Sequence, residues 1–368
     1  MNIRGIVEEV CGRTHRFGNI HTHMCRLVAL ALLCCFLSGC DSIPASGTND
    51  IHSIHVLSYN VENAFDDRID GTEYVDYSSD SNYYDDSLWR VKIDHIRDVL
   101  QATGAPQIVG LVEVENERMA RMILESVRDL GYIDMSITHG RSTTQCVLLS
   151  SFSVVFSSSL PTTAGVRDIL SASVDIDGTQ VHILVNHWKA KDTGETESLR
   201  MQSARVARTE VDRIFKEKPD ADILLLGDFN STEDEHRKTG RTTGINDILR
   251  TTGNVALVSG ASYMLYDPWF ELTPEQRGTT LHDAEWQSLD HIIMSPGLFD
   301  RSGMSYDRGS FDAVRIPFLL SFQRAADGRR APNRWQESEC EHGTAGYSDH
   351  LPILAQFMLW PLSTTTGP

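Results

Sequence analysis

The stretch "DILLLGDFNS" (222–231) is the most informative part of the sequence, because an apolar run ends abruptly in polar residues. The run 223–226 is short, continuous and apolar, which is typical of a strand buried on both faces. Gly227 ends the run, and Asp228 and Asn230 follow at once. One interpretation is a strand end closed by an Asx turn. The other is a rigid strand that delivers a carboxylate and an amide to a functional site.

Composition and charge narrow the class of protein. The chain has 368 residues, of which 40% are hydrophobic and 23% charged, as in a globular protein with one large or two ordinary domains. No apolar run in the sequence is long enough to span a bilayer. The formal net charge of −18 is not the electrostatic footprint of a protein that binds nucleic acid tightly.

An apolar leader, "LVALALLCCFLSGC" (27–40), predicts export. Its length suits the apolar region of a signal peptide, although a buried helix is the alternative interpretation. The small residues before Cys40 resemble the lipobox of bacterial lipoproteins. This resemblance implies cleavage before Cys40, a lipid on its thiol, and anchoring to a membrane at the periplasmic or cell-surface face. Residues 1–23 carry two glutamates and several histidines, which fit a leader badly, so we predict that translation starts at Met24.

The expected organisation is a signal peptide (1–39), a lipidated cysteine with its tether (40–52), one folded domain (53–360) and a short tail (361–368). Loss of residues 1–39 would remove four arginines and two glutamates and change the formal charge from −18 to −20. Beyond Cys40, only Cys146 and Cys340 remain. A disulfide and two buried free thiols are both compatible with an exported protein.

Hydrophobic periodicity predicts an early alternation of strands and helices, followed by strands and loops, which favours a layered α/β domain with mixed sheets. Gly104 and Gly131 are expected to end the first two helices. Residues 62–86 are acidic and read as a loop. The expected helices cover 89–100, 119–130 and 197–216, and the expected strands cover 54–60, 107–114, 145–150, 172–176, 181–187, 222–226, 288–295 and 352–358.

Polar residues recur at the ends of these strands, where a rigid sheet can fix them while loops stay open. Each one alone could be structural, for example as a capping carboxylate or a satisfied imidazole. Six such strand ends are better explained by one shared site, whereas His291 is expected to face the other way and to be structural. Asp290 lies within its expected strand, and 348–350 precede the last one. The candidate residues are Asn60, Glu62, Glu113, Asn186, His187, Asp228, Asn230, Asp290, Ser348, Asp349 and His350.

These pieces resemble the endonuclease/exonuclease/phosphatase superfamily with the deoxyribonuclease-I-like fold, and in particular its exported bacterial branch. The resemblance implies a four-layer α/β sandwich, in which two mixed β-sheets are flanked by helices and the site lies where the edges of the sheets meet. It covers 54–358, and it rests on "SYNVEN", "GLVEVEN", "VNHWKAK", "LLGDFNS", "SLDHIIMS" and "GYSDHLPI" in that order.

The resemblance implies hydrolysis of a phosphate ester with a divalent ion. Mg²⁺ is the expected ion, with Mn²⁺ or Ca²⁺ as alternatives, because a hard cation takes carboxylates and phosphate oxygens as ligands. Glu113, with Glu62 beside it, is the expected ligand. Asp349 is expected either to help a second ion or to hold His350, so the number of ions stays open.

The same resemblance assigns catalytic roles. Asp228 would orient or deprotonate the attacking water, and His350, oriented by Asp290, would be a base or a phosphate clamp. Which of the two takes the proton stays open. His187 would protonate the leaving oxygen. The expected phosphate-binding residues are Asn60, Asn186 and Asn230.

One segment departs from the branch. "RSTTQCVLLS" (141–150) has Gln145 where an Asp is usual and Arg141 one residue out of register, so substrate contacts near this strand stay open. The leading hypothesis is an exported, lipid-anchored, monomeric phosphodiesterase or nuclease. The alternatives are a phosphatase, a sphingomyelinase-like lipid phosphodiesterase, or a surface-binding lipoprotein without turnover. The fold alone does not choose among them.

Overall fold

A computed structural model describes residues 52–71, 73–74, 88–191, 196–260, 263–335 and 346–360. Contacts divide the chain after Asp50, and all described residues belong to the unit that starts at Ile51. The predicted signal peptide, the start at Met24, lipidation of Cys40, the pairing of Cys340 and the tail after 360 lie outside the described residues and stay predictions.

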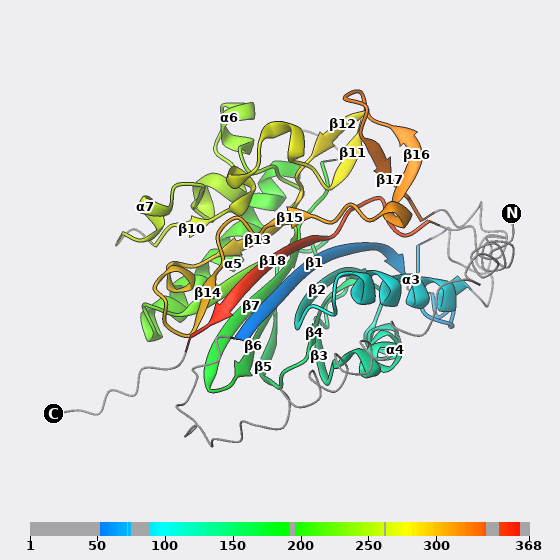
Figure 1. Ribbon diagram of the computed structural model, residues 1–368, viewed down its shortest axis with the longest axis horizontal. Helices are drawn as coiled ribbons and strands as arrows, with labels where there is room; N and C mark the ends of the chain where they lie inside the picture. The colour runs from blue at the N-terminus through cyan, green and yellow to red at the C-terminus, as the bar shows by residue number, and fades with distance from the viewer. Residues whose placement is uncertain are drawn as a thin grey trace, which may run out of the picture. The chain divides into compact units, whose positions relative to one another are not determined.

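The first sheet is mixed, with the strand order β14-β18-β1-β2-β4-β3 and with β15 also paired to β18 (Figure 1). β1 runs parallel to β2 and antiparallel to β18, so a late strand lies beside the first one described. The strands of this sheet are β1 (His52–Ala64), β2 (Ile108–Val114), β3 (Asp134–Ile137), β4 (Gln145–Ser150), β14 (Met304–Tyr306), β15 (Asp312–Ala313) and β18 (Ile353–Leu359).

The second sheet is also mixed, with the order β5-β6-β7-β8-β13-β10-β9. β7 and β8 are parallel, and β13 pairs antiparallel with β8 so that Asp290 lies opposite Asp228. The strands of this sheet are β5 (Val154–Leu160), β6 (Ile169–Ile176), β7 (Thr179–His187), β8 (Asp222–Asp228), β9 (Thr251–Thr252), β10 (Leu265–Tyr266) and β13 (Asp290–Met294).

The two sheets pack face to face, and the alternation of side chains along each strand shows why. β1 turns Val56 toward the second sheet and Leu57 toward the opposite face, because neighbouring strand residues point to opposite sides. β8 turns Leu226 toward the first sheet and Leu225 toward the opposite face. Both strands are buried on both faces at these positions, and the sequence of β8 accordingly reads as a continuous apolar run.

Helices cover the outer face of each sheet. α3 (Leu88–Ala102) and α4 (Glu117–Val127) pack on the first sheet, and α5 (Thr196–Glu217) packs on the second. Gly131 ends the helical turn after α4 in the left-handed conformation, at φ 101°. None of the helices among the described residues is long and apolar enough to cross a membrane. Two short helices, α6 (Glu235–Thr239) and α7 (Val255–Val258), lie between β8 and β10 in the sequence.

Two small hairpins stand beside the sheets and contact each other through β11 and β17 (Figure 1). They consist of β11 (Thr280–His282) with β12 (Glu285–Gln287), and β16 (Leu320–Arg324) with β17 (Arg330–Pro332). The sequence patterns did not predict these hairpins, β3 or β5. The predicted fold class is confirmed: two mixed sheets pack against each other and helices cover their outer faces.

Candidate active site

The two sheets meet at Asn60, whose side chain connects a carboxylate from each of them. The Asn60 Nδ2 group donates to Glu113 Oε1 at 3.0 Å and to Asp228 Oδ2 at 3.2 Å. Glu113 lies at the end of β2 in the first sheet, and Asp228 ends β8 in the second. Asn60 and Asp228 are buried. Because Glu113 and Asp228 both lie at the ends of strands, the sheets rather than loops hold the two carboxylates together.

Irregular backbone aims several of these side chains. Glu62, Glu113 and Asn230 all have left-handed backbone, with φ of 51°, 68° and 48°. The pairing of β2 with β4 shifts register between Val112 and Val114, which marks a bulge at Glu113. Such conformations cost about 1–3 kcal/mol each in residues other than glycine. Bulges next to active sites re-aim side chains, and this one turns Glu113 toward Asn60.

Both interpretations of the segment 228–230 hold at once. The backbone N–H of Asn230 donates to Asp228 Oδ1 at 2.8 Å, which is the Asx turn. The other oxygen, Oδ2, accepts from Asn60. Burial raises the pKa of Asp228, while the charge of His350 opposes that rise. The turn therefore holds the carboxylate in place and leaves one oxygen directed into the site.

His187 lies between the same two carboxylates. Its Nε2 atom is 3.6 Å from Glu113 Oε1 and 3.7 Å from Asp228 Oδ2. Burial, and then the positive charge of Arg167, lowers the pKa of His187 well below its ordinary value. The lowered pKa favours the neutral imidazole, which can donate one hydrogen bond from Nε2 to an oxygen in the site.

His350 and Asp290 form a dyad on the other side of Asp228. His350 Nδ1 lies 2.7 Å from Asp290 Oδ2, and the Thr279 hydroxyl donates to the same oxygen. Although burial alone would lower it, the Asp290 carboxylate raises the pKa of His350 well above its ordinary value. The Nε2 atom of His350 is 4.0 Å from Asp228 Oδ2. The predicted pairing of Asp290 with His350 is present in the structure.

Glu62 is placed differently from the expectation for a metal ligand. Its Oε1 accepts from Arg334 Nε at 2.7 Å. Its Oε2 accepts from the backbone N–H groups of Trp335 and Asp349, each at 2.7 Å. Both oxygens are therefore used to hold neighbouring segments, and the structure makes Glu62 a positioning residue next to Asp349 rather than a partner of Glu113.

Asn186 also differs from its expected phosphate-binding role. It is fully buried; its Nδ2 donates to Leu184 O at 2.9 Å, and its Oδ1 accepts from Trp188 Nε1 at 3.1 Å. No group of Asn186 is left for a phosphate, so its role is structural. His291 faces away from the site, as expected, with its ring nitrogens on Asp267 and on Ser231 O.

The donor set fits a divalent ion in two overlapping places. Ligand atoms of Asp228, Asp290 and His350 lie within 4.8 Å of one another, and all three side chains are buried. Among the described residues, Asp290 Oδ1 and His187 Nδ1 are buried without a hydrogen-bond partner. Glu113 and Asp228 form the second carboxylate pair, joined by Asn60. Carboxylate oxygens are the ligands that Mg²⁺, Mn²⁺ and Ca²⁺ prefer.

Sequence reasoning missed Thr279 and Arg334. Thr279 supports Asp290, and Arg334 lies 3.9 Å from Asp349 Oδ2 while it contacts Glu62. Neither residue lies at the end of a strand that periodicity could predict, so no local signal marked it. Sequence reasoning also did not name Lys189, although it follows His187 by two residues in "NHWKAK".

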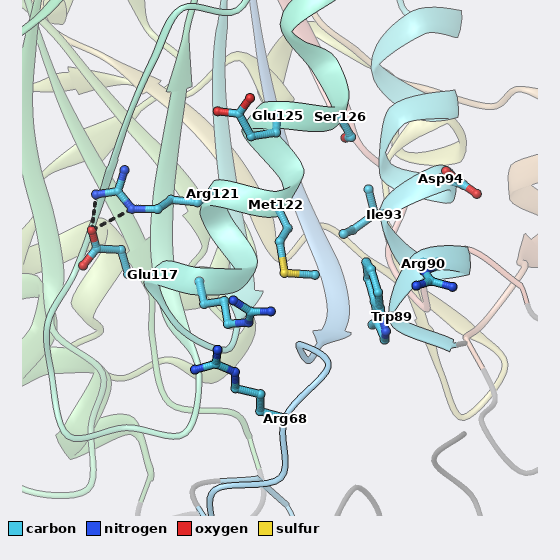
Figure 2. Close-up of a pocket in the computed structure, with 11 residues that line it drawn as sticks. Arg68, Trp89, Arg90, Ile93, Asp94, Glu117, Arg121, Met122, Glu125 and Ser126 are labelled. Atoms are coloured by element: carbon cyan, nitrogen blue, oxygen red, sulfur yellow. Dashed lines mark hydrogen bonds and ion pairs between the residues drawn. The ribbon is translucent and has the colours of Figure 1, made fainter. Parts of the chain in front are cut away.

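A cavity of about 840 Å³ between α3 and α4 contains none of the predicted site residues (Figure 2). Trp89 and Ile93 of α3 face Met122 of α4 across it. At its rim Arg121 pairs with Glu117. The candidate active site is instead the cluster around Asn60, where carboxylates and imidazoles converge.

The comparisons with known proteins agree with this geometry. Residues 55–358 match the Endonuclease/Exonuclease/phosphatase family, and no curated protein is significantly similar in sequence. A protein of that family from Bacteroides thetaiotaomicron is 15% identical, with a TM-score of 0.51 over 84% of this chain and 98% of its own. A mannosyl-6-phosphatase from the same organism is also 15% identical, with a TM-score of 0.51 over 83% of this chain and 99% of its own.

A third similar structure is D. rerio TDP2 complexed with a single-strand DNA product. It is 17% identical and has a TM-score of 0.50 over 83% of this chain and 98% of its own. At such identities the structural likeness shows the fold alone. The family match covers most of the chain, however, and the catalytic residue types lie together at the strand ends. The chain therefore belongs to the endonuclease/exonuclease/phosphatase family and is a hydrolase that acts on phosphate esters.

Proposed function

We propose that this chain is a metal-dependent phosphodiesterase, exported and anchored to a membrane by a lipid on Cys40. The observation that carries the catalytic part is the connection from Asn60 to Glu113 and Asp228, with an imidazole on each side of Asp228. The pKa of His187 is lowered, whereas that of His350 is raised. Two such imidazoles suit an ester with a poor leaving group, because one can act near the attacking water and the other near the leaving oxygen.

The ion is proposed to bind at Glu113 rather than between Asp290 and His350. Those two side chains already bond each other at 2.7 Å, and Thr279 donates to the same Asp290 oxygen. When bound, the ion polarises the phosphoryl group and stabilises the charge that develops on it. Asn60 would hold both carboxylates in register and Asp228 would orient the attacking water.

The histidines divide the remaining work in this proposal. Asp290 keeps His350 positively charged, so His350 would clamp a non-bridging phosphoryl oxygen, and Asp228 is the better candidate for the base. His187, whose pKa is lowered by burial, would donate a hydrogen bond from Nε2 to the leaving oxygen. The similar solved structures include a mannosyl-6-phosphatase and TDP2 with a DNA product. A phosphomonoesterase is therefore the second candidate.

Glu113→Gln is expected to weaken the affinity for the divalent ion by at least about tenfold, because removal of an outer partner of a metal ligand already costs that much. Titration of the metal-free protein with Mn²⁺, followed by calorimetry, measures the affinity. Hydrolysis of a chromogenic diester, plasmid, RNA, sphingomyelin and inositol phosphates, with and without Mg²⁺, measures the activity. Glu117→Gln on the exposed face of α4 is the matched control and should change neither.

Two outcomes would contradict this assignment. Unchanged ion affinity in Glu113→Gln, together with lost affinity in Asp290→Asn, would move the ion to the cluster of Asp228, Asp290 and His350. Full activity in excess chelator would remove the ion requirement altogether.

The leader at 27–40 supports the anchoring part of the proposal. Cys40→Ser is expected to move the protein from the membrane fraction to the supernatant, because the lipid on the thiol would supply the attachment. Fractionation of cells that express each variant measures this, with Cys35→Ser in the leader as the control. If Cys40→Ser stays with the membrane in the presence of carbonate, the lipid is not the anchor.

A further inference from the structure

A second cavity, of about 690 Å³, is lined by three cationic side chains, Arg141, Arg167 and Lys189. Lys189 follows His187 at the end of β7, and Arg167 lies just before β6, which pairs with β7. The lining residues Ser142 and Thr143 precede β4, whose Gln145 pairs with Val114 of β2, next to Glu113. The cavity therefore adjoins the active site on the side of His187.

The walls of this cavity are held in place by buried polar contacts. Gln145, which is buried, accepts from Thr138 Oγ1 at 2.8 Å and donates to Ser142 O at 2.6 Å. It also accepts from the backbone N–H of Gly140 at 3.2 Å. Gln145 thus secures both sides of the loop that carries Arg141. This contact set gives Gln145 a structural role, at the position where the family resemblance leads one to expect an aspartate.

Arg167 also lines the cavity, and hydroxyl groups orient its side chain. Its Nε donates to Thr144 Oγ1 at 3.2 Å, and its NH2 group donates to the Tyr74 hydroxyl at 3.3 Å. Neither hydroxyl partner carries a charge. Among the described residues that line the cavity, Asp168 is the one carboxylate, and its Oδ1 accepts from the backbone N–H of Thr162 at 3.1 Å. The described lining therefore holds more cationic than anionic side chains, in a chain of net charge −18.

We infer that this cavity binds a second phosphate group of the substrate, next to the scissile ester on the side of His187. The inference rests on the proposed phosphodiesterase function and deepens it. Guanidinium groups match the planar geometry of phosphate oxygens and bind them in pairs. The volume lies in the range of pockets that hold a nucleotide-sized group. A choline headgroup carries a positive charge and would be repelled, so the inference disfavours sphingomyelin as substrate.

Two sources could supply the second phosphate: the next phosphodiester along a nucleic-acid strand, or the other phosphate of a small bisphosphate ester. Two matched pairs of substrates separate them. The first pair is a dinucleotide with and without a terminal phosphate. The second is an inositol monophosphate and the corresponding bisphosphate. For each pair, the measured ratio is the kcat/KM of the substrate with the extra phosphate divided by the kcat/KM of the substrate without it.

The wild-type ratio is expected to be about 10 to 100 for at least one pair, which corresponds to one charged hydrogen-bonding contact. Arg141→Gln and Arg167→Gln should each lower that ratio about tenfold. Arg90→Gln on α3, which does not line this cavity, is the matched control and should leave the ratio unchanged. Arg141 is exposed, so its variant is expected to fold even if the Arg167 variant does not.

A ratio above one for the dinucleotide pair alone identifies a strand of nucleic acid, and a ratio above one for the bisphosphate alone identifies a small ligand. Ratios near one for both pairs overturn the inference, and so does a ratio that Arg141→Gln leaves intact. Calorimetric binding of each pair to the wild-type protein in chelator does not depend on turnover. A binding preference without hydrolysis would preserve this inference while refuting the proposed function. Hydrolysis without a binding preference would refute this inference while preserving the proposed function.

Discussion

His350→Ala is expected to lower kcat for phosphate-ester hydrolysis by about 10²- to 10⁴-fold, the range for a side chain that holds charge or a proton in the transition state. The reason is the position of its ring, 2.7 Å from Asp290 and 4.0 Å from Asp228 Oδ2. Single-turnover kinetics with a chromogenic diester measures the loss. His282→Ala on β11 is the matched control, because that imidazole is exposed and lies outside the cluster.

The dyad also predicts non-additive losses. Asp290→Asn removes the charge that keeps His350 protonated, so it should reproduce much of the His350→Ala effect. Effects of residues that act as a unit are non-additive, and the double variant should be little slower than either single one. If the losses multiply instead, Asp290 acts independently of His350. That outcome would favour Asp290 as a ligand of the ion in the cluster with Asp228.

Gly227→Ala is expected to lower the free energy of unfolding by more than about 3 kcal/mol, since it adds steric overlap to backbone strain. Gly227 has a φ of +123°, and a Cβ atom there would lie 1.9 Å from the backbone oxygen of Asn186 on the neighbouring strand. Relief would require β7 and β8 to separate where His187 and Asp228 lie opposite each other. Urea unfolding followed by circular dichroism measures the change.

Gly260→Ala is the control for this variant. Its Cβ would find no atom closer than 3.6 Å, so its free energy of unfolding should change by less than about 1 kcal/mol. Equal midpoints for the two variants would show that the strands can separate at Gly227 without cost, and that the close approach is not required.

The sequence predicted the strands because their apolar runs are local, and it predicted the site because its residues lie directly after or before those runs. Asp228 and His350 were found in this way. The orientation of Glu62 could not be predicted, because it depends on Arg334, which is 272 residues away along the chain. Asn186 was assigned to phosphate because it precedes His187, but the indole of Trp188 and two strand carbonyls already satisfy its amide.

The bulge at Glu113 is a further limit of sequence reasoning. Glutamate rarely adopts left-handed backbone, so nothing in "GLVEVEN" indicated a φ of 68°. The bulge is stable only because β1 and β4 hold β2 on both sides. The bulge costs local free energy, which the pairing and packing of the surrounding sheet offset. It can therefore be recognised only in the assembled sheet.

The pairing of β18 with β1 has a consequence for biosynthesis. His350 precedes β18, and β18 must pair with β1 from the beginning of the domain before His350 can reach Asp290 and Asp228. A growing chain that has passed Asp228 but has not reached residue 359 has Glu113, His187 and Asp228 but lacks the complete strand that holds the last imidazole in place. The site is therefore complete only after β18 has been synthesised and paired, and a ribosome-bound fragment without β18 is expected to be inactive.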